Sequence, residues 1–470
     1  MLIFIKIVLI NIQMDKDDIK DNIVDTMLDI YYDQDICSAT FLISLDVISV
    51  YLSLENEVND INKIIYCSIF IATSFTENFN VDLLSKNGIK NVSDDEVCSF
   101  FKKIFGRVNW IKYYGEFGTN RIISDMYIMY SVYCFKKNII NIQYCGITKL
   151  FEFLTQQIAE IPISSRDVCS NFVAMIDEMD HCFDKNKLDI IRNTSDSLQQ
   201  TYTIQNNICP LIRGFPLKKI ASGSYGAVCI SQHKKKKMAQ KTCEHVTSFI
   251  KEVICLISMK NDNIISIGGV GKKGYEIYMD LMDCDLDDYA VKTKRQDIIL
   301  SSILCGCINA IQYIHSIGLI HRDIKPKNIL IKETWEEPIV KLCDFGICGN
   351  VVSGTAELTS CMYTFPYRPP ECFDKNGYDF TADIWAFGCT VYEIFQQKLL
   401  FPYSPKLERR IRSKKSFINY YSCLFTNDII DLETDTIPSS IINIIRGCVT
   451  MYPRNRISSQ KILTYLHESL

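Results

Sequence analysis

Two short segments of the chain carry side chains suited to phosphate chemistry. Residues 321–328 read HRDIKPKN and residues 344–346 read DFG, so together they supply two carboxylates, lysines and an amide. A triphosphate needs such groups, because its charge must be neutralised by cations and by metal ions held on oxygen ligands. A weak nucleophile such as a hydroxyl must also be aimed at the phosphorus atom. The two segments therefore predict phosphoryl transfer from a nucleotide with bound magnesium.

A glycine-rich stretch upstream could hold the phosphates of that nucleotide. Residues 220–228 read IASGSYGAV, and two strands joined by such a turn can fold their backbone closely over phosphates, because glycine has no Cβ. An ordinary hairpin turn explains this stretch alone about equally well. The candidate nucleotide-binding residues are Ala221, Ser222, Gly223, Ser224, Tyr225, Gly226 and Val228.

A lysine and a glutamate follow the glycine-rich stretch. Lys241 ends the sequence MAQK, and Glu252 lies in FIKEVICLISM, whose apolar residues recur at helical spacing. A lysine on a strand can hold the α- and β-phosphates of ATP, and its ammonium needs an acid to fix it. We therefore expect a helix that carries Glu252 to pair with Lys241. Taken alone, each charge would be a solvated surface group.

The ordered set of segments resembles the eukaryotic-type serine/threonine protein kinase family over residues 217–470. The resemblance implies a bilobal α+β kinase fold, ATP and Mg²⁺ as cofactors, and protein substrates. It makes Asp323 the catalytic acceptor of the hydroxyl proton and Lys325 the residue that steadies the γ-phosphate. It makes Asn328 and Asp344 the metal ligands. Family usage of the lysine in HRDIK favours serine or threonine over tyrosine as the acceptor.

The resemblance also assigns residues that support the site. Glu371, in RPPE, stands at the acid position of A-P-E, and Arg456 stands where the family keeps the arginine that pairs with this acid. Asp383, in DIWAFGC, matches the aspartate that braces the catalytic loop from a buried helix. Arg322 lies in that loop. Arg322, Asp383 and Arg456 are expected to be structural, and the activation segment is expected to contain Thr359, Thr364, Arg368 and Glu371.

Within the family, the chain most resembles the cyclin-dependent kinase branch. Residues 364–371 read TFPYRPPE and resemble T-L-W-Y-R-A-P-E, with Arg368 as the arginine that marks the branch. Thr359, five residues before Thr364, falls where those kinases carry an activating phosphothreonine. One departure is Lys251, which replaces the arginine usual before the helix glutamate.

The N-terminal half is predicted to be a separate helical domain. Residues 15–183 are expected to be all-α, and residues 184–216 form a polar linker. Residues 41–79 resemble a cyclin box, with Asp46 and Glu77 at its acid positions. The resemblance implies an activator carried in cis at high effective concentration, which would press on the helix of the kinase glutamate.

Residues 92–117 resemble the last helix of the same box, with Trp110 near its usual aromatic residue. Ser74 stands where the box has a lysine, which is a departure from the pattern. A generic helical interaction domain is the alternative for this half. For the whole chain, the alternative is a pseudokinase or a cyclin-like regulatory scaffold.

Composition limits the partners and the compartment. The net charge is −4 and the pI is near 6.0, so no nucleic-acid partner is expected. The apolar run at the N-terminus is too short to span a bilayer, and no membrane contact is expected. The 21 cysteines contain no C-x-x-C pair, which is typical of reduced thiols. We therefore expect an intracellular protein, cytoplasmic or nuclear.

Overall fold

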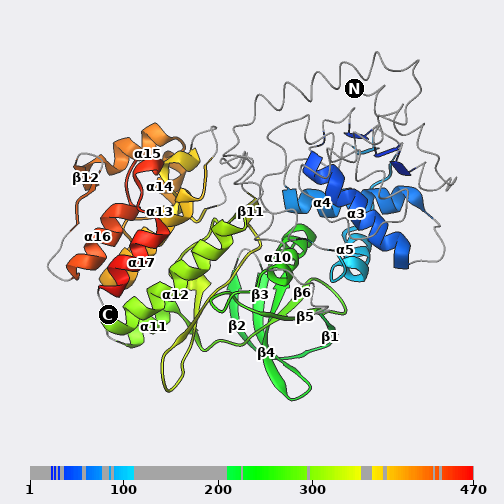
Figure 1. The fold of residues 1–470 in the computed structure, drawn as a ribbon, viewed down its shortest axis with the longest axis horizontal. Helices are drawn as coiled ribbons and strands as arrows, with labels where there is room; N and C mark the ends of the chain where they lie inside the picture. The colour runs from blue at the N-terminus through cyan, green and yellow to red at the C-terminus, as the bar shows by residue number, and fades with distance from the viewer. Residues whose placement is uncertain are drawn as a thin grey trace, which may run out of the picture.

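The computed structural model describes parts of the N-terminal region and most of the C-terminal half (Figure 1). Several predicted features lie outside the described residues, among them Glu77, Ser224, Tyr225, Thr359 and most of the expected linker. The described residues are 23–24, 26–27, 30–31, 36, 38–54, 60–76, 84–85, 89–108, 110, 209–223, 226–293, 297–350, 363–373, 378–426, 429–432 and 437–468.

Three helices define the described N-terminal region: α3 (Ser38–Leu54), α4 (Ile61–Thr76) and α5 (Asp94–Ile104). Helix α5 begins where the Ser93 backbone N–H donates to the Glu96 carboxylate at 3.3 Å, which satisfies one of the free donors of a helix start. Glu96 also pairs with Lys63 of α4 at 2.5 Å. These helices confirm a helical N-terminal region, and its likeness to a cyclin box stays a prediction.

The small lobe of the C-terminal half is a six-stranded sheet with the order β1-β5-β6-β4-β3-β2. Its strands are β1 (Leu211–Ile212), β2 (Phe215–Gly223), β3 (Gly226–His233), β4 (Lys236–Cys243), β5 (Ile267–Gly271) and β6 (Glu276–Met279). Strand β1 runs parallel to β5 and lies inside the range expected to be linker. The sheet therefore begins before residue 217. Helix α10 (Val246–Ser258) packs on this sheet and buries its apolar residues.

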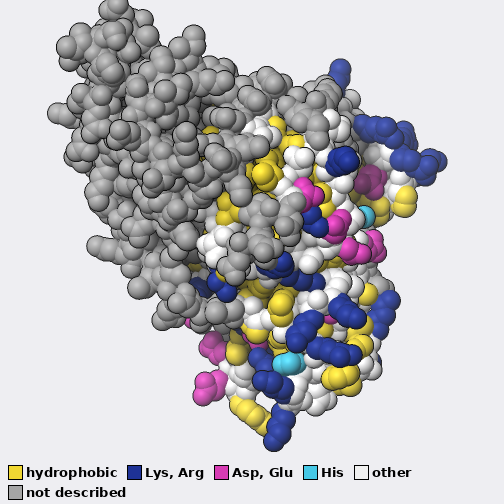
Figure 2. Space-filling model, turned by 90° about the vertical axis from the view of Figure 1, so that its right-hand side faces the viewer, with side chains coloured by type: hydrophobic (Ala, Val, Ile, Leu, Met, Phe, Trp, Pro, Cys, Tyr) yellow, Lys and Arg dark blue, Asp and Glu magenta, His cyan; other side chains and the backbone are white. Residues whose placement is uncertain are grey.

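The turn between β3 and β4 carries four successive lysines. Lys234 adopts a positive φ of 54°, and residues 234–237 are all exposed. Lys236 pairs with Asp280 at 3.3 Å. The run is thus a solvated turn. Figure 2 shows how prominent lysine and arginine side chains are on the described part of this face of the molecule.

The large lobe is mainly helical. Its helices are α11 (Leu286–Lys292), α12 (Asp297–Ser316), α13 (Thr381–Gln396), α14 (Pro405–Arg410), α15 (Lys414–Tyr421), α16 (Ser439–Cys448) and α17 (Ser459–His467). Its strands are β7 (Cys284–Asp285), β8 (Leu319–Ile320), β9 (Ile329–Lys332), β10 (Ile339–Leu342), β11 (Gly349–Asn350), β12 (Phe425–Thr426) and β13 (Ile429–Ile430). Helix α13 is almost wholly buried, and its Trp385 stacks on Phe401 with ring centroids 5.4 Å apart.

Helix α12 is long and apolar enough over Ile299–Ser316 to cross a membrane by length and composition, with a mean hydropathy of 1.3. However, 61% of this window is buried inside the fold. The helix packs against α17 and β10. It therefore serves as the core helix of the large lobe.

The helical N-terminal region contacts the small lobe through α10. Both α4 and α5 lie against this helix, as the ribbon also shows (Figure 1). The rings of Phe101 on α5 and Phe249 on α10 meet edge to face, with centroids 6.0 Å apart. The described N-terminal helices therefore pack on the helix that carries Glu252.

Candidate active site

The glycine-rich stretch forms the hairpin between β2 and β3. Gly223 and Gly226 pair across it, and Gly226 has a φ of 134°, which side chains rarely adopt. A Cβ at Gly226 would lie 2.0 Å from the Thr242 carbonyl oxygen, so only glycine fits. Ala221 pairs with Val228 near the start of the hairpin. Ser222 and Gly223 lie at the end of β2, and the tip itself lies outside the described residues.

Lys241 connects the two lobes. It projects from β4, and its ammonium donates to Oε2 of Glu252 on α10 at 2.6 Å and to Oδ1 of Asp344 at 2.7 Å. Burial alone would lower the pKa of Lys241, but the two carboxylates outweigh burial and raise this pKa above its usual range. For Asp344, burial alone would raise the pKa, but the charge of the Lys241 ammonium outweighs burial and lowers this pKa. The lysine is therefore a fixed cation, and Asp344 stays an anion.

Asp323 lies at the centre of the catalytic loop and is 2% exposed. Its Oδ2 accepts from the Lys325 ammonium at 2.6 Å and its Oδ1 from the Thr364 hydroxyl at 2.5 Å. Lys325 also donates to that hydroxyl at 3.0 Å. The catalytic loop thus brings a carboxylate and an ammonium into contact with the Thr364 hydroxyl of a distant segment, which is an arrangement suited to moving a hydroxyl proton.

Asn328 and Asp344 have the donor chemistry that a magnesium ion requires. The amide nitrogen of Asn328 donates to the backbone carbonyl and to Oδ2 of Asp323, both at 2.8 Å. Among the described residues, the amide oxygen of Asn328 makes no hydrogen bond. Oxygen ligands of this type suit Mg²⁺. The predicted metal ligands, one carboxylate and one amide oxygen, therefore fit the ion.

Asp383 braces the catalytic loop from the start of α13. Its carboxylate accepts from the backbone N–H groups of His321 at 2.7 Å and Arg322 at 2.9 Å. Burial would raise the pKa of Asp383, but the hydrogen bond from His315 and the nearby histidines lower it. Arg322 itself has a φ of 69°, a conformation that costs energy in a non-glycine residue. The brace therefore stabilises a strained loop.

Two further hydrogen-bond partners of Asp383 were not predicted from the sequence. His315 Nε2 lies 2.9 Å from Oδ2, and the Tyr363 hydroxyl donates to Oδ1 at 3.2 Å. His315 lies in the last turn of α12, shortly before the HRD segment, and this position could have drawn attention to it. Tyr363 carries no local signal, because its contact with Asp383 arises only from the tertiary fold.

The predicted pair of Glu371 and Arg456 is present and buried. The guanidinium donates to both carboxylate oxygens, at 2.5 and 2.7 Å, and lies over the ring of Trp385 at 5.0 Å from its centroid. A bidentate pair of this kind fixes geometry as well as charge. It anchors the end of the activation segment to the large lobe.

Arg368 holds the loop beside Thr364. Its guanidinium donates twice to the Tyr363 carbonyl, at 3.2 and 2.7 Å. It also lies over the rings of Phe365 and Phe373, at 5.5 and 5.4 Å from their centroids. Arg368, the arginine that suggested the branch, therefore orders the backbone next to Thr364.

Lys251 of α10 and Arg322 of the catalytic loop are both buried cations. Lys251 is 6% exposed and Arg322 is fully buried. Burial, and then the charge of Arg322, lower the pKa of Lys251 to about 7. The charge of Arg322 disfavours the charged form of Lys251, so an anion placed beside Lys251 would be stabilising.

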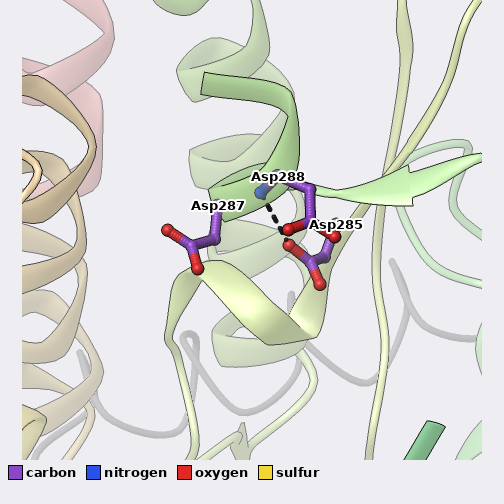
Figure 3. A group of neighbouring side chains, drawn as sticks. All are labelled: Asp285, Asp287 and Asp288. Carbon is purple, nitrogen blue, oxygen red and sulfur yellow. Dashed lines mark hydrogen bonds between the residues drawn. The ribbon is translucent and has the colours of Figure 1, made fainter. Parts of the chain in front are cut away.

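Three acidic side chains gather at the start of α11 (Figure 3). Asp285 caps the helix, because it accepts from the Asp288 backbone N–H at 3.0 Å. The ammonium of Lys327 lies 3.2 Å from Asp285, 3.0 Å from Asp287 and 3.6 Å from Asp288. The cluster is therefore a helix cap whose negative charge is partly neutralised by Lys327.

Comparison with known proteins places this geometry in a family. The family model described as "Protein kinase domain" matches residues 216–467. The chain is 32% identical over 213 residues to the sporulation protein kinase mde3 of Schizosaccharomyces pombe, covering 39% of this chain and 38% of that protein. It is 30% identical over 229 residues to mitogen-activated protein kinase 13 of Arabidopsis thaliana, covering 44% and 62%.

It is 29% identical over 214 residues to cyclin-dependent kinase G1 of Arabidopsis thaliana, covering 41% of this chain and 34% of that protein. The match therefore spans about a third to three-fifths of the length of these relatives. The family model covers more than half of this chain, and the residues it spans include the whole site described above. The chain belongs to the protein kinase family.

Proposed function

We propose that the protein transfers the γ-phosphoryl group of ATP, with Mg²⁺, to serine or threonine residues of protein substrates. The observation that carries this proposal is the contact of Asp323 with both the Lys325 ammonium and the Thr364 hydroxyl. An aliphatic hydroxyl already lies at 2.5 Å from the carboxylate that would accept the proton. This arrangement supports a serine or threonine acceptor.

Each residue of the site has a role in this proposal. Lys241, fixed by Glu252, would hold the α- and β-phosphates, and Asn328 and Asp344 would hold the metal ion. The bound ion neutralises the charge of the phosphates. Asp323 aims the acceptor hydroxyl and takes its proton, and Lys325 stabilises the charge that develops on the transferred group.

We propose more specifically that the protein belongs to the cyclin-dependent kinase branch. Arg368 and its double hydrogen bond to the Tyr363 carbonyl support it. The relatives named above include a mitogen-activated protein kinase at similar identity. The branch is therefore best tested through the substrates that the protein selects.

We further propose that the N-terminal helices activate the kinase in cis. The support is the packing of α4 and α5 on α10, the helix that carries Glu252. Lys102 of α5 donates to the Gly274 carbonyl at 2.5 Å, and Tyr275 donates to Asp95 at 3.4 Å. These contacts link α5 to the turn between β5 and β6 as well. Such a clamp would favour the Lys241–Glu252 pair, which must form before ATP is aligned.

A non-catalytic scaffold is the competing class. Pseudokinases commonly lack one of the charged residues of the site, whereas here Lys241 contacts Asp344 and Asn328 contacts Asp323. A generic helical interaction domain is the alternative for the N-terminal region. The location inside the cell, cytoplasmic or nuclear, remains a proposal based on the cysteine pattern.

Nucleotide binding tests the proposed function without knowledge of the substrate. Mg·ATP should raise the melting temperature of the protein, because a ligand that binds the folded state stabilises it. Lys241→Ala should abolish this shift. A protein that is not stabilised by Mg·ATP, or a variant that is stabilised as much as the wild type, would contradict the proposal.

A further inference from the structure

The large lobe carries a concentration of positive charge in a protein whose net charge is −4. Residues 406–415 read KLERRIRSKK and span α14, the short connection after it and the start of α15. Five exposed cations of this segment form what we call the basic ridge: Lys406, Arg409, Arg410, Arg412 and Lys415. In the part of the chain that the structure describes, no member of the ridge makes an ion pair.

The backbone beneath the ridge is well anchored. Leu407 and Ile411 are buried, and the Ser404 hydroxyl caps α14 by accepting from the Leu407 N–H at 3.1 Å. The Nε atoms of two arginines are also fixed, since Arg409 donates to Pro405 at 3.2 Å and Arg412 donates to Arg409 at 3.0 Å. Both bonds use Nε, so the terminal nitrogens of these guanidinium groups remain for an external anion.

Residues on either side of the ridge contact the segment that follows Thr364. Tyr403, next to the start of α14, contacts Phe365 with ring centroids 5.7 Å apart. Phe365 directly follows Thr364, whose hydroxyl bonds to Asp323. On the other side, Phe417 of α15 contacts Phe373 at 5.7 Å. Tyr403 and Phe417, which flank the ridge in the sequence, thus contact the segment that contains Thr364.

We propose that the basic ridge binds an acidic segment of the protein substrate and makes the kinase prefer acceptors with nearby acidic residues. The inference rests on the proposed function and specifies its substrate class. Arginine is the side chain best suited to this task, because its planar donors match carboxylate or phosphate groups in two-pronged hydrogen bonds. An extended chain advances about 3.3 Å per residue, so acidic residues several positions from the acceptor can reach the ridge.

Two peptides test the preference. One carries a single serine flanked on both sides by a block of aspartate and glutamate, and the other has the same sequence with asparagine and glutamine. The ridge variant is Arg409→Gln, Arg410→Gln, Arg412→Gln. The control variant removes three exposed charges from the small lobe: Lys218→Gln, Lys235→Gln, Lys237→Gln. The readouts are kcat/KM for each peptide and direct binding of each labelled peptide by fluorescence anisotropy.

The wild type and the control variant should prefer the acidic peptide, mainly through KM. The ridge variant should lose about 3- to 100-fold of that preference, the range expected from three partly solvated ion pairs. Binding should weaken as salt is added, because surface charge pairs are screened. An equal preference in the ridge and control variants would overturn the inference.

Direct measurement of peptide binding distinguishes a failure of this inference from a failure of the proposed function. If the acidic peptide binds through the ridge but is never phosphorylated, the docking surface stands and the proposed catalysis fails. If peptides are phosphorylated without regard to their charge, catalysis stands and the ridge assignment fails.

Single-stranded RNA serves as a third probe. RNA that binds the ridge while the acidic peptide does not would overturn the substrate assignment in favour of a nucleic-acid surface.

Discussion

Phe101 of the N-terminal helices meets Phe249 of the kinase helix edge to face, with ring centroids 6.0 Å apart. Phe249 lies one helical turn before Glu252, the residue that fixes Lys241. Deletion of the N-terminal region should therefore lower kinase activity. We expect the fragment 205–470 to be about 5- to 150-fold less active than the full chain, the usual range for coupling between two parts of a protein.

Two controls accompany this comparison. Calorimetry should show that the fragment is folded, and the fragment retains all six strands of the small lobe. Addition of residues 1–183 in trans should restore activity if these helices act as a cyclin does. A folded fragment with the specific activity of the full chain would show that the N-terminal region is not an activator.

Thr359 should be phosphorylated in the active protein. A phosphate there adds about −1.5 to −2 charge. We expect it to lie beside the buried cations Lys251 and Arg322, where it would favour the charged form of Lys251. Mass spectrometry of the active protein should find the phosphate, and Thr359→Ala should lower activity. The neighbouring hydroxyl provides the control, because Ser360→Ala should leave activity unchanged. Full activity of unphosphorylated protein would contradict the prediction.

Arg456→Met should destabilise the large lobe. It would leave the Glu371 carboxylate buried without its bidentate partner, and breaking a buried ion pair on one side costs about 3–5 kcal/mol. The free energy of unfolding from denaturant titration measures this loss. Arg454→Met, an exposed neighbour, is the matched control. Equal stability of the two variants would show that the buried pair does not hold the lobe together.

Tyr363→Phe should have a smaller and more specific effect. It removes the hydroxyl that donates to Asp383 and keeps the ring, which packs against Tyr378 with centroids 5.5 Å apart. A hydrogen bond of this kind contributes about 0.5–1.5 kcal/mol. We expect a loss of stability in that range together with a several-fold fall in kcat. A variant with wild-type stability and wild-type kcat would rule out a positioning role for the hydroxyl.

Local segments explain why so much of the site could be predicted. Asp323, Lys325 and Asn328 lie within a few residues of one another, and their contacts are formed inside one loop. The pairs Lys241–Glu252 and Glu371–Arg456 were predicted from motifs that carry their own sequence signature, and the structure contains both.

Contacts between residues that no short sequence pattern marks were not predicted. Strand β1 is only two residues long and pairs with β5, where Leu211 lies opposite Val270, so no periodicity could reveal it. The hydrogen bond between Tyr363 and Asp383 depends on how the activation segment packs on α13. The cations of the basic ridge lie close together in the sequence, but the contact of the neighbouring Tyr403 with Phe365 follows only from the folded chain.

Phosphate transfer by the wild type and by Asp323→Asn tests the central claim most directly. Purified protein is incubated with γ-labelled ATP, Mg²⁺ and a mixture of protein substrates, and the labelled amino acids are then identified. We expect phosphoserine or phosphothreonine from the wild type. We also expect a loss of about two to four orders of magnitude in kcat for the variant, with nucleotide binding nearly unchanged. Activity of the variant within tenfold of the wild type, or label found on tyrosine alone, would contradict the central claim.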